Sequence, residues 1–416
     1  MSSSNVVSER LVTPIDPSWI PETLRVSPDA RRVAYAALAG DGFAVMLDGQ
    51  KRQTYDGVGD LTFSPDSRRL TFRAQAGEKQ FVVVGDQEGA RYDGTGQGSL
   101  TFSPDSQRVA YAAQSGESWF VVVDGQKVGP YHGLGSILFS PDSQRVAYAA
   151  QEEDRQFVVA DGRAGKRYDG VTDLVFSPDG RKLAYRAQLD DEQFIVVDDQ
   201  EERPYDGTAP DTLTFSPDGQ RLAYVGLAGG KWRVVVDGKE QGRYFDVKIL
   251  TFSPDSQRLA YAAQLSRRLL VFRTGYKWFV VADGEEITAY HDVKELTYSP
   301  DSQQLAYAAR VGSMWCVIVD GHESKRYDAL GDLVFGPDGQ RVAYGAQSGD
   351  QYFVVVDGVA GKSYDSVVLG GAGGRIVFES PDSFHHMAIA GEGIYCVTAK
   401  TSSAPDEVAD NRGSST

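Results

Sequence analysis

The sequence predicts an all-β fold, a single closed β-propeller of about ten four-stranded blades. Three observations support this prediction. A Ser-Pro-Asp turn recurs along almost the whole chain, and each copy is followed by the same succession of short β-type segments. The last copy stops before its final strand, and a strand-like segment precedes the first copy. Repeats of this kind bury their faces against one another, which predicts one continuous array.

The repeat is visible as near-identical strings of residues. Phe102 to Gln114 reads FSPDSQRVAYAAQ, and Phe139 to Gln151 has the same string. The aspartate of the turn recurs at intervals of mostly about 37 to 39 residues, within the range typical of propeller blades. Its ten copies are Asp29, Asp66, Asp105, Asp142, Asp179, Asp218, Asp255, Asp301, Asp338 and Asp382.

Each unit contains four β-type segments and no helical pattern. In the third unit they are 100–102, 109–113, 119–123 and a short segment that ends at Tyr131. Ser103 to Asp105 and Asp124-Gly125 supply the turn chemistry between them. Residues 119–123 are apolar at every position, so this strand needs cover on both faces. Copies of the same sheet arranged radially provide that cover.

The motif Phe-Ser-Pro-Asp-Gly/Ser-x-Arg-Leu/Val-Ala-Tyr resembles the repeat of WD-repeat-like propellers of the TolB type over nearly all of residues 7–400. This resemblance implies four-stranded blades around a central channel and, most often, protein binding. TolB itself is periplasmic and has an extra N-terminal domain, and neither a leader nor that domain is visible in this sequence.

The ends of the repeat array predict how the ring closes. The tenth unit has β-type segments at 375–378, 387–390 and 394–397 but no fourth one. The first inner strand is expected at 23–26. Residues 8–14 precede it, at the place where the repeat would have a fourth strand. We expect this N-terminal strand to complete the last blade and remove its open edge. Residues 7–400 then form the propeller, with disordered segments at 1–6 and 401–416.

Composition and charge narrow the function. The chain has 416 residues, 41% of them hydrophobic, and a formal net charge of -16. This charge repels phosphate backbones and anionic lipids, so we expect no nucleic-acid or membrane partner. No apolar run reaches the roughly 18 residues of a membrane helix. With no leader pattern, and with Cys316 and Cys396 inside apolar segments as inert buried thiols, we expect a cytoplasmic protein.

Turn lengths predict two unlike faces. The turns after the first and third strands keep one length, whereas the loops after the second and fourth strands vary and emerge on the opposite face. The longest insertion lies between Gln264 and Trp278, where basic and apolar residues suit a protein partner or, alternatively, an extended hairpin packed on a neighbouring blade. The predicted partner-binding residues are Arg267, Arg268, Leu270, Phe272, Arg273 and Tyr276.

The same face repeats an acid or a histidine directly after the fourth-strand tyrosine. A ring of such groups could hold cations or basic peptides, although an aspartate before glycine more often serves its own turn. These rim candidates are Asp56, Asp93, His132, Asp169, Asp206, His291, Asp328 and Asp365. Most of the Ser-Pro-Asp aspartates also stand three residues before a basic residue, as Asp105 does before Arg108, which predicts an ion pair that braces the turn.

The sequence contains no catalytic motif that we recognise. It has no Gly-x-Ser-x-Gly element, and 361–363 imitates only the end of a phosphate-binding loop. The neighbours His385 and His386 should point apart on a strand and not share a metal. We therefore expect no cofactor and no metal. The glycine run at 370–374 is consistent with a ligand-approach loop or a flexible connector.

The leading hypothesis is a non-enzymatic, bacterial-type scaffold that binds a protein partner through the variable loops around the channel. A lectin-like or small-ligand propeller that uses tyrosines such as Tyr131 and Tyr168 as stacking platforms is the alternative, as is a TolB-like accessory protein. An enzyme with its site in the channel mouth is a third possibility. Near-identical units also fit recent amplification of one blade or a consensus design. The oligomeric state stays open.

Overall fold

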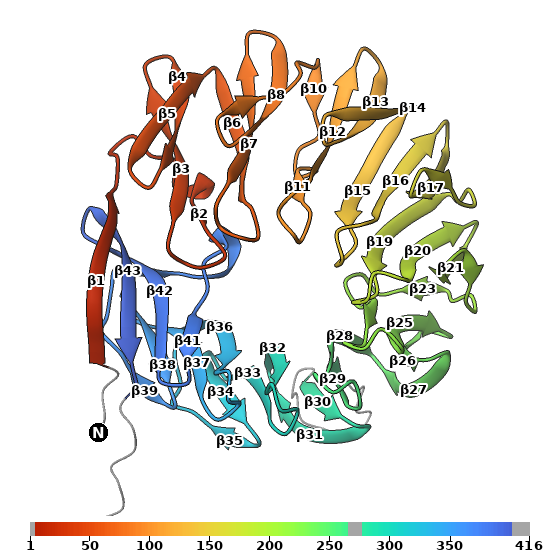
Figure 1. Ribbon diagram of the computed structural model, residues 1–416. Helices are drawn as coiled ribbons and strands as arrows, with labels where there is room; N and C mark the ends of the chain where they lie inside the picture. The colour runs from red at the N-terminus through yellow and green to blue at the C-terminus, as the bar shows by residue number, and fades with distance from the viewer. Residues whose placement is uncertain (1–4, 265–276, 402–416) are drawn as a thin grey trace, which may run out of the picture.

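The computed structural model describes residues 5–264 and 277–401, and it shows ten antiparallel sheets arranged in a ring around a central channel (Figure 1). Within the described residues there are two short 3-10 turns and no α-helix, and no helix is long and apolar enough to cross a membrane. The predicted β-propeller and its ten blades are confirmed.

The first five blades follow one another directly along the chain. Blade 1 contains β2 (Arg25–Val26), β3 (Val33–Ala39), β4 (Gly42–Leu47) and β5 (Gln50–Tyr55). Blade 2 contains β6 (Gly57–Phe63), β7 (Leu70–Ala76), β8 (Lys79–Val84) and β9 (Gln87–Glu88). Blade 3 contains β10 (Gly94–Thr95), β11 (Thr101–Phe102), β12 (Val109–Ser115), β13 (Ser118–Val123) and β14 (Gln126–Tyr131). Blade 4 contains β15 (Gly133–Phe139), β16 (Val146–Glu152), β17 (Arg155–Ala160) and β18 (Arg163–Ala164). Blade 5 contains β19 (Gly170–Phe176), β20 (Leu183–Leu189), β21 (Glu192–Val197) and β22 (Gln200–Glu201).

The second five blades complete the circle. Blade 6 contains β23 (Gly207–Thr208), β24 (Thr214–Phe215), β25 (Leu222–Ala228), β26 (Lys231–Val236) and β27 (Lys239–Tyr244). Blade 7 contains β28 (Asp246–Phe252), β29 (Leu259–Gln264), β30 (Trp278–Ala282) and β31 (Glu285–Tyr290). Blade 8 contains β32 (Asp292–Tyr298), β33 (Leu305–Val311), β34 (Met314–Val319) and β35 (His322–Glu323). Blade 9 contains β36 (Ala329–Phe335), β37 (Val342–Ser348), β38 (Gln351–Val356) and β39 (Val359–Ala360). Blade 10 contains β40 (Ser366–Val368), β41 (Val377–Ser380), β42 (Ser383–Ala390), β43 (Gly393–Lys400) and the N-terminal β1 (Asn5–Pro14).

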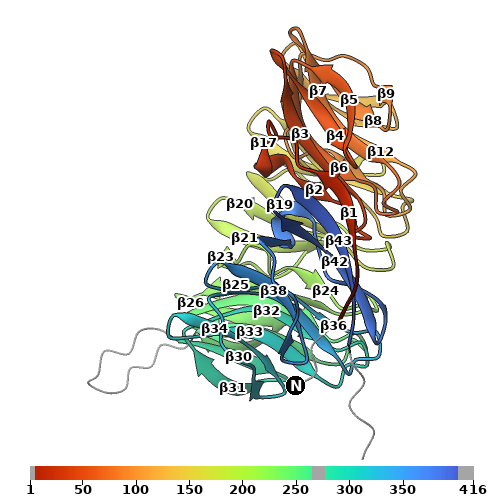
Figure 2. The same cartoon turned by 90° about the vertical axis from the view of Figure 1, so that its left-hand side faces the viewer.

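The N-terminal strand latches the ring as predicted. Strand β1 pairs antiparallel with β43, with Arg10 opposite Cys396, and forms the outer edge of blade 10 (Figure 2). The boundaries differ from the prediction at both ends. The strand begins at Asn5 because residues 5 and 6 already pair with β43. At the other end Thr401 donates its backbone amide to the carbonyl of Asp382 at 2.9 Å, and the rest of the predicted tail lies outside the described residues.

Two inner strands differ from the prediction, the first by its length and the tenth by its position, since β41 covers Val377–Ser380 and not 375–378. The first covers only Arg25–Val26, because Pro21 begins a 3-10 turn (η1, Pro21–Thr23) that includes Thr23. In blade 10 the glycine run forms a second 3-10 turn (η2, Gly370–Ala372) that divides the inner strand into β40 and β41. Gly373 has a φ of 78°, and a Cβ on Gly374 would clash with the Val368 carbonyl. This run is therefore an ordered connector.

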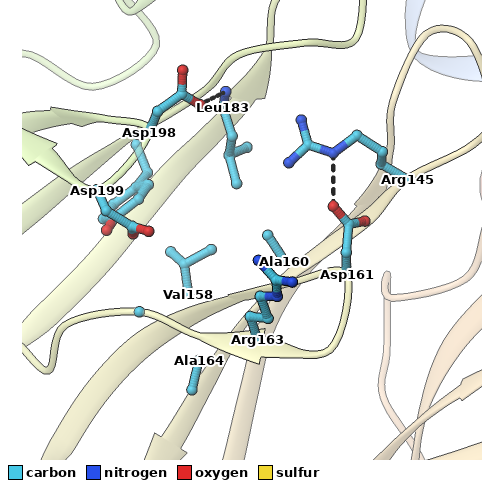
Figure 3. Close-up of a pocket in the computed structure, with 11 residues that line it drawn as sticks. Arg145, Val158, Ala160, Asp161, Arg163, Ala164, Leu183, Asp198 and Asp199 are labelled. Carbon is cyan, nitrogen blue, oxygen red and sulfur yellow. Dashed lines mark hydrogen bonds and ion pairs between the residues drawn. The ribbon is translucent and has the colours of Figure 1, made fainter.

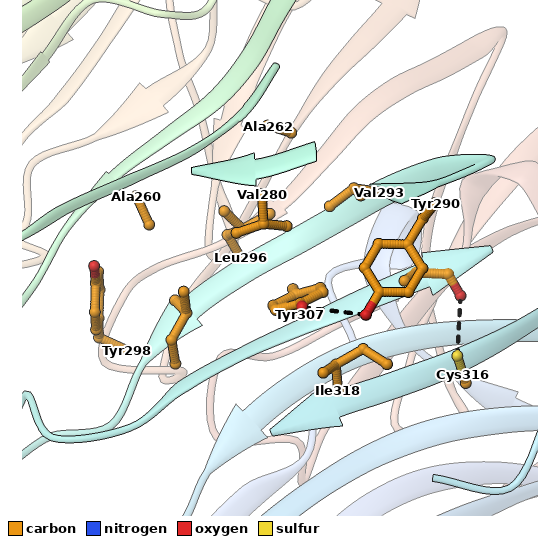
Figure 4. Packing of buried hydrophobic residues seen from close by; sticks show 12 residues of the cluster. Ala260, Ala262, Val280, Tyr290, Val293, Leu296, Tyr298, Tyr307, Cys316 and Ile318 are labelled. Atoms are coloured by element: carbon orange, nitrogen blue, oxygen red, sulfur yellow. Dashed lines mark hydrogen bonds between the residues drawn. The ribbon is translucent and has the colours of Figure 1, made fainter. Parts of the chain in front are cut away.

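Aromatic rings join each blade to the next. The tyrosine at the end of a fourth strand meets an aromatic ring of the following second strand edge to face, as in Tyr290 and Tyr307, whose centroids are 5.8 Å apart. Figure 4 shows this pair in the apolar layer between blades 7 and 8, near the thiol of Cys316. Both cysteines are buried and unpaired, and burial raises the pKa of Cys316. The ring closes through the pair Trp19 and Tyr35 and a shared core of blades 10 and 1.

The face with the invariant turns, here called the constant-turn face, ties each blade to its neighbour. The amide of Asp105 donates to Oγ of Ser143 in the next blade at 2.9 Å. The Arg108 guanidinium reaches the Ser143 carbonyl and lies 5.1 Å from the ring centroid of Phe139. The predicted ion pair between Asp105 and Arg108 is wrong. Arg108 Nε instead donates to Asp124 at 2.8 Å, because Asp105 already accepts bonds from its own turn.

Candidate functional site

The eight rim candidates form one repeated hydrogen bond. Each side chain accepts a backbone N–H from the turn between the second and third strands of the blade that it precedes, and the two histidines accept through Nδ1. The donors are Gly77 for Asp56 (2.6 Å), Gly116 for Asp93 (2.7 Å), Glu153 for His132 (2.6 Å), Asp190 for Asp169 (2.6 Å), Gly229 for Asp206 (2.9 Å), Gly312 for His291 (3.1 Å), Gly349 for Asp328 (2.7 Å) and Gly391 for Asp365 (2.6 Å).

This bond gives the rim groups a structural role. Asp93 also accepts a bond from Lys79 Nζ at 2.5 Å, and this bond, together with the Gly116 amide, lowers the pKa of Asp93. The eight groups are spread over eight blades and do not converge. Within residues 5–264 and 277–401, no group of three or more His, Cys, Asp or Glu side chains is arranged to hold a metal ion. The arrangement thus favours a structural role over a cation-binding rim, although the turn that each group caps is not its own turn, as expected, but the turn between the second and third strands of the next blade.

Eight blades have this capping bond, and the described residues of blades 1 and 7 do not. At the entrance to blade 7 the rim position is Phe245, which is 45% exposed, and Lys231 Nζ lies 5.6 Å from its ring centroid. Blade 7 is also the blade whose second and third strands are separated by the long insertion, which begins after Gln264. The six predicted partner-binding residues, Arg267 to Tyr276, lie outside the described residues.

The inner strands of blades 7 and 8 also differ from those of other blades, because each has a lysine at a position where several blades have a small residue. Lys248 Nζ lies 4.0 Å from the ring centroid of Trp278 and donates to Asp292 of blade 8 at 2.7 Å. Lys294 Nζ lies 4.7 Å from the ring centroid of Trp315. The equivalent inner-strand positions of blades 2, 4, 5 and 9 carry small residues, Gly59, Gly135, Thr172 and Gly331. Sequence reasoning missed these lysines, although a charge at a small-residue position of a repeat was a usable signal.

The predicted stacking tyrosine Tyr168 and the neighbouring histidines His385 and His386 are all buried. Tyr168 is fully buried and packs against Tyr185, so it offers no open stacking platform. The ring of His386 packs against Phe384 and Tyr364, whereas His385 Nε2 lies 2.6 Å from the carbonyl of Asp29. Burial lowers the pKa of His386 to about 3. The two histidines have separate surroundings, as expected for neighbours on a strand.

The constant-turn face, opposite to the face with Phe245, contains a groove. Between blades 4 and 5 a cavity of about 480 Å³ is open to solvent, and its polar wall is formed by the turns that follow the third strands (Figure 3). Asp198 and Asp199 lie on one side of it, and the ion pair of Arg145 with Asp161 lies on the other, next to Arg163 (Figure 3). A cavity of about 570 Å³ lies at the equivalent place between blades 8 and 9.

No protein-family model matches the chain, and no curated protein matches it significantly. Similar solved structures include the Dos1 propeller (9% identity, 72% of this chain and 90% of that one, TM-score 0.38). TolB from Acinetobacter baumannii has 14% identity over 72% of this chain and 77% of that one, with a TM-score of 0.30. The dihydro-heme d1 dehydrogenase NirN has 14% identity over 77% of both chains, with a TM-score of 0.39. By its own strand pairing this chain is a ten-bladed β-propeller, the fold that its TolB-like repeat motif implied.

Proposed function

We propose that the protein is a non-catalytic scaffold that binds a protein partner through the sector of its variable-loop face around blade 7. The single observation that supports this location is Phe245. A capping acid or histidine occupies the same position in eight other places, whereas Phe245 leaves a large apolar ring 45% exposed.

The surroundings of Phe245 fit a protein contact. Aromatic residues and arginine are enriched at the centres of protein interfaces. Lys231 lies beside the ring of Phe245. Lys248, on the inner strand β28 that directly follows Phe245, lies over the ring of Trp278 on the third strand β30. The insertion at 265–276 adds three arginines and several apolar residues to the same blade. In a chain with a net charge of -16, this local basic sector favours a partner with an acidic and aromatic surface.

The test is a quantitative pull-down from native lysate with the intact chain and three variants. Phe245→Asp restores the residue type of the other blades and should preserve the fold. Replacement of 265–276 by Ser-Gly-Glu, the residues at 115–117 of blade 3, gives the blade 7 loop the length of the others. Leu38→Asp is the control, because Leu38 is also an exposed apolar residue (56%), near the end of the second strand of blade 1 and therefore on the same face.

We expect a partner that binds the intact chain and Leu38→Asp equally, and that binds Phe245→Asp at least about tenfold more weakly, as loss of one interface anchor predicts. Equal recovery with Phe245→Asp and with the shortened loop would remove this sector from the proposal.

A further inference from the structure

The groove between blades 4 and 5 departs from the repeat on its acidic side. In six blades an arginine stands immediately before the second strand. It forms an ion pair with the aspartate of the turn after the third strand, as Arg145 does with Asp161. Blade 5 has Lys182 at this position, and its Nζ donates to the Gly219 carbonyl of blade 6 at 3.1 Å. Among the described residues Asp198 consequently has no ion-pair partner.

A second carboxylate is added next to the first. The residue after the turn aspartate is a glycine with positive φ in most blades, for example Gly162 with a φ of 77°. Blade 5 has Asp199 there, with a φ of 64°. A non-glycine residue in this left-handed region is strained unless something compensates, although aspartate tolerates it better than most residues. Asp199 lines the groove and forms no ion pair with any described residue.

A buried hydroxyl in the wall of the groove also lacks a partner. Tyr185 is 2% exposed, lines the cavity, and has no hydrogen-bond partner for its hydroxyl among the described residues. Its neighbour Tyr168 donates to Glu201 instead, at 3.0 Å. Where the outer strand is six residues long, between blades 3 and 4, the hydroxyls of Tyr131 and Tyr148 bond each other at 2.8 Å. An unpaired buried hydroxyl is costly and favours a ligand that would satisfy it.

The junction between blades 8 and 9 repeats the unpaired aspartate and the unpaired hydroxyl but not the second carboxylate, because Gly321 follows the turn aspartate there. Gln304 stands where other blades have arginine, so Asp320 forms no ion pair with any described residue. Tyr344 is 2% exposed and its hydroxyl has no partner there either. Asp320 and Tyr344 both line the cavity of about 570 Å³. At both junctions the outer strand of the preceding blade has only two residues, which leaves the groove uncovered.

We propose that the groove between blades 4 and 5 binds the guanidinium or ammonium group of a basic side chain from another molecule. Asp198 and Asp199 would accept the charged N–H groups, as carboxylates do in charge-assisted hydrogen bonds. The Tyr185 hydroxyl would accept one more. Val158 and Leu183 form the apolar part of the lining, against which the alkyl stem of a lysine or arginine packs. The groove is therefore a second interaction surface, independent of the Phe245 sector.

The experiment is a titration of the intact, methyl-labelled protein followed by NMR, with Val158 and Leu183 as reporters. The probe is Nα-acetyl-arginine amide, and the neutral comparator is Nα-acetyl-citrulline amide, which has the same shape without the charge. We expect saturable shifts of both reporters with the arginine probe and none with citrulline.

Asp199→Gly supplies the decisive variant, because glycine is the residue of the other blades and suits the positive φ. We expect it to weaken binding by about tenfold, the value of one charge-assisted hydrogen bond. Lys182→Arg should also weaken binding, since arginine would pair with Asp198 as in the other blades, and Tyr185→Phe should weaken it about threefold.

Asp211→Gly is the matched control. It removes the same charge at another exposed position with a φ of 56°, outside the groove. Equal weakening by Asp211→Gly and Asp199→Gly would reduce the effect to the overall charge of the protein and overturn the proposal. An absence of saturable shifts in the intact protein would overturn it as well, and neither result would bear on Phe245.

Discussion

The two faces of the ring are stabilised in different ways. On the constant-turn face the bonds run from blade to blade, as when Asp105 and Arg108 of blade 3 both reach Ser143 of blade 4. On the variable-loop face the repeated bond stays inside one blade, as when Asp56 caps the turn at Gly77. Besides the apolar layers between blades, the repeated polar bonds from blade to blade therefore lie on the constant-turn face, and the other face can change its loops without losing them.

The largest expected effect follows from removing the latch. Deletion of residues 1–14 eliminates β1, a ten-residue strand whose ladder bonds contribute about 1 kcal/mol each, so we expect a loss of at least about 5 kcal/mol of stability. Chemical denaturation monitored by tryptophan fluorescence measures this loss. A synthetic peptide of residues 1–14 should restore the midpoint when added in trans. An unchanged midpoint in the truncated chain would show that the ring does not depend on β1.

A smaller effect compares the two faces directly. Arg108→Ala removes an ion pair, bonds to the next blade and the contact with Phe139, and we expect a loss of about 2 kcal/mol. Asp56→Ala removes one capping bond, for which we expect a loss of about 0.5 to 1 kcal/mol. Both losses are measured by the denaturation midpoint at neutral pH. If Asp56→Ala costs as much stability as Arg108→Ala, the proposed difference between the faces is wrong.

The closing junction adds a dependence on pH. His386 occupies the place of the second-strand tyrosine in the other blades, between Tyr364 and Phe384, with His385 and Glu9 as the nearby titratable groups. Burial lowers the pKa of His386 from 6.5 to about 3, so the folded protein resists protonation that the unfolded chain accepts. Its contribution is complete above about pH 6.5 and is lost as the pH falls toward 3.

We expect the intact protein to lose about 1 kcal/mol of stability per pH unit below pH 6 relative to His386→Tyr, which carries the tyrosine of the other blades. Denaturation midpoints at pH 7, 6 and 5 check this difference. Parallel pH profiles for the two proteins would mean that His386 is not the group responsible.

The candidate sites show which polar contacts could be predicted from the sequence and which could not. The rim aspartates were expected to serve their own turns, because aspartate often precedes glycine in a turn. Asp56 instead caps the turn at Gly77 between the second and third strands of the next blade, a partner that only the strand pairing brings close. The partner of Arg108 was predicted wrongly, since it depends on the pairing of the second and third strands, which places Asp124 beside it. The unpaired hydroxyl of Tyr185 could not be predicted, because it depends on the distance between two blades.

The sequence by itself determined the repeat, the four strands of each blade and the N-terminal latch, because periodicity and turn residues act locally and are repeated in every unit. Only the tertiary structure decided which polar groups find partners between blades. Asp198 and Tyr185 occupy repeat positions whose equivalents are paired in other blades. Asp198 has no ion-pair partner among the described residues because Lys182 bonds the next blade, and the Tyr185 hydroxyl is unpaired where the outer strand β18 is only two residues long. Pairing between blades depends on contacts across the junction, which no single unit encodes.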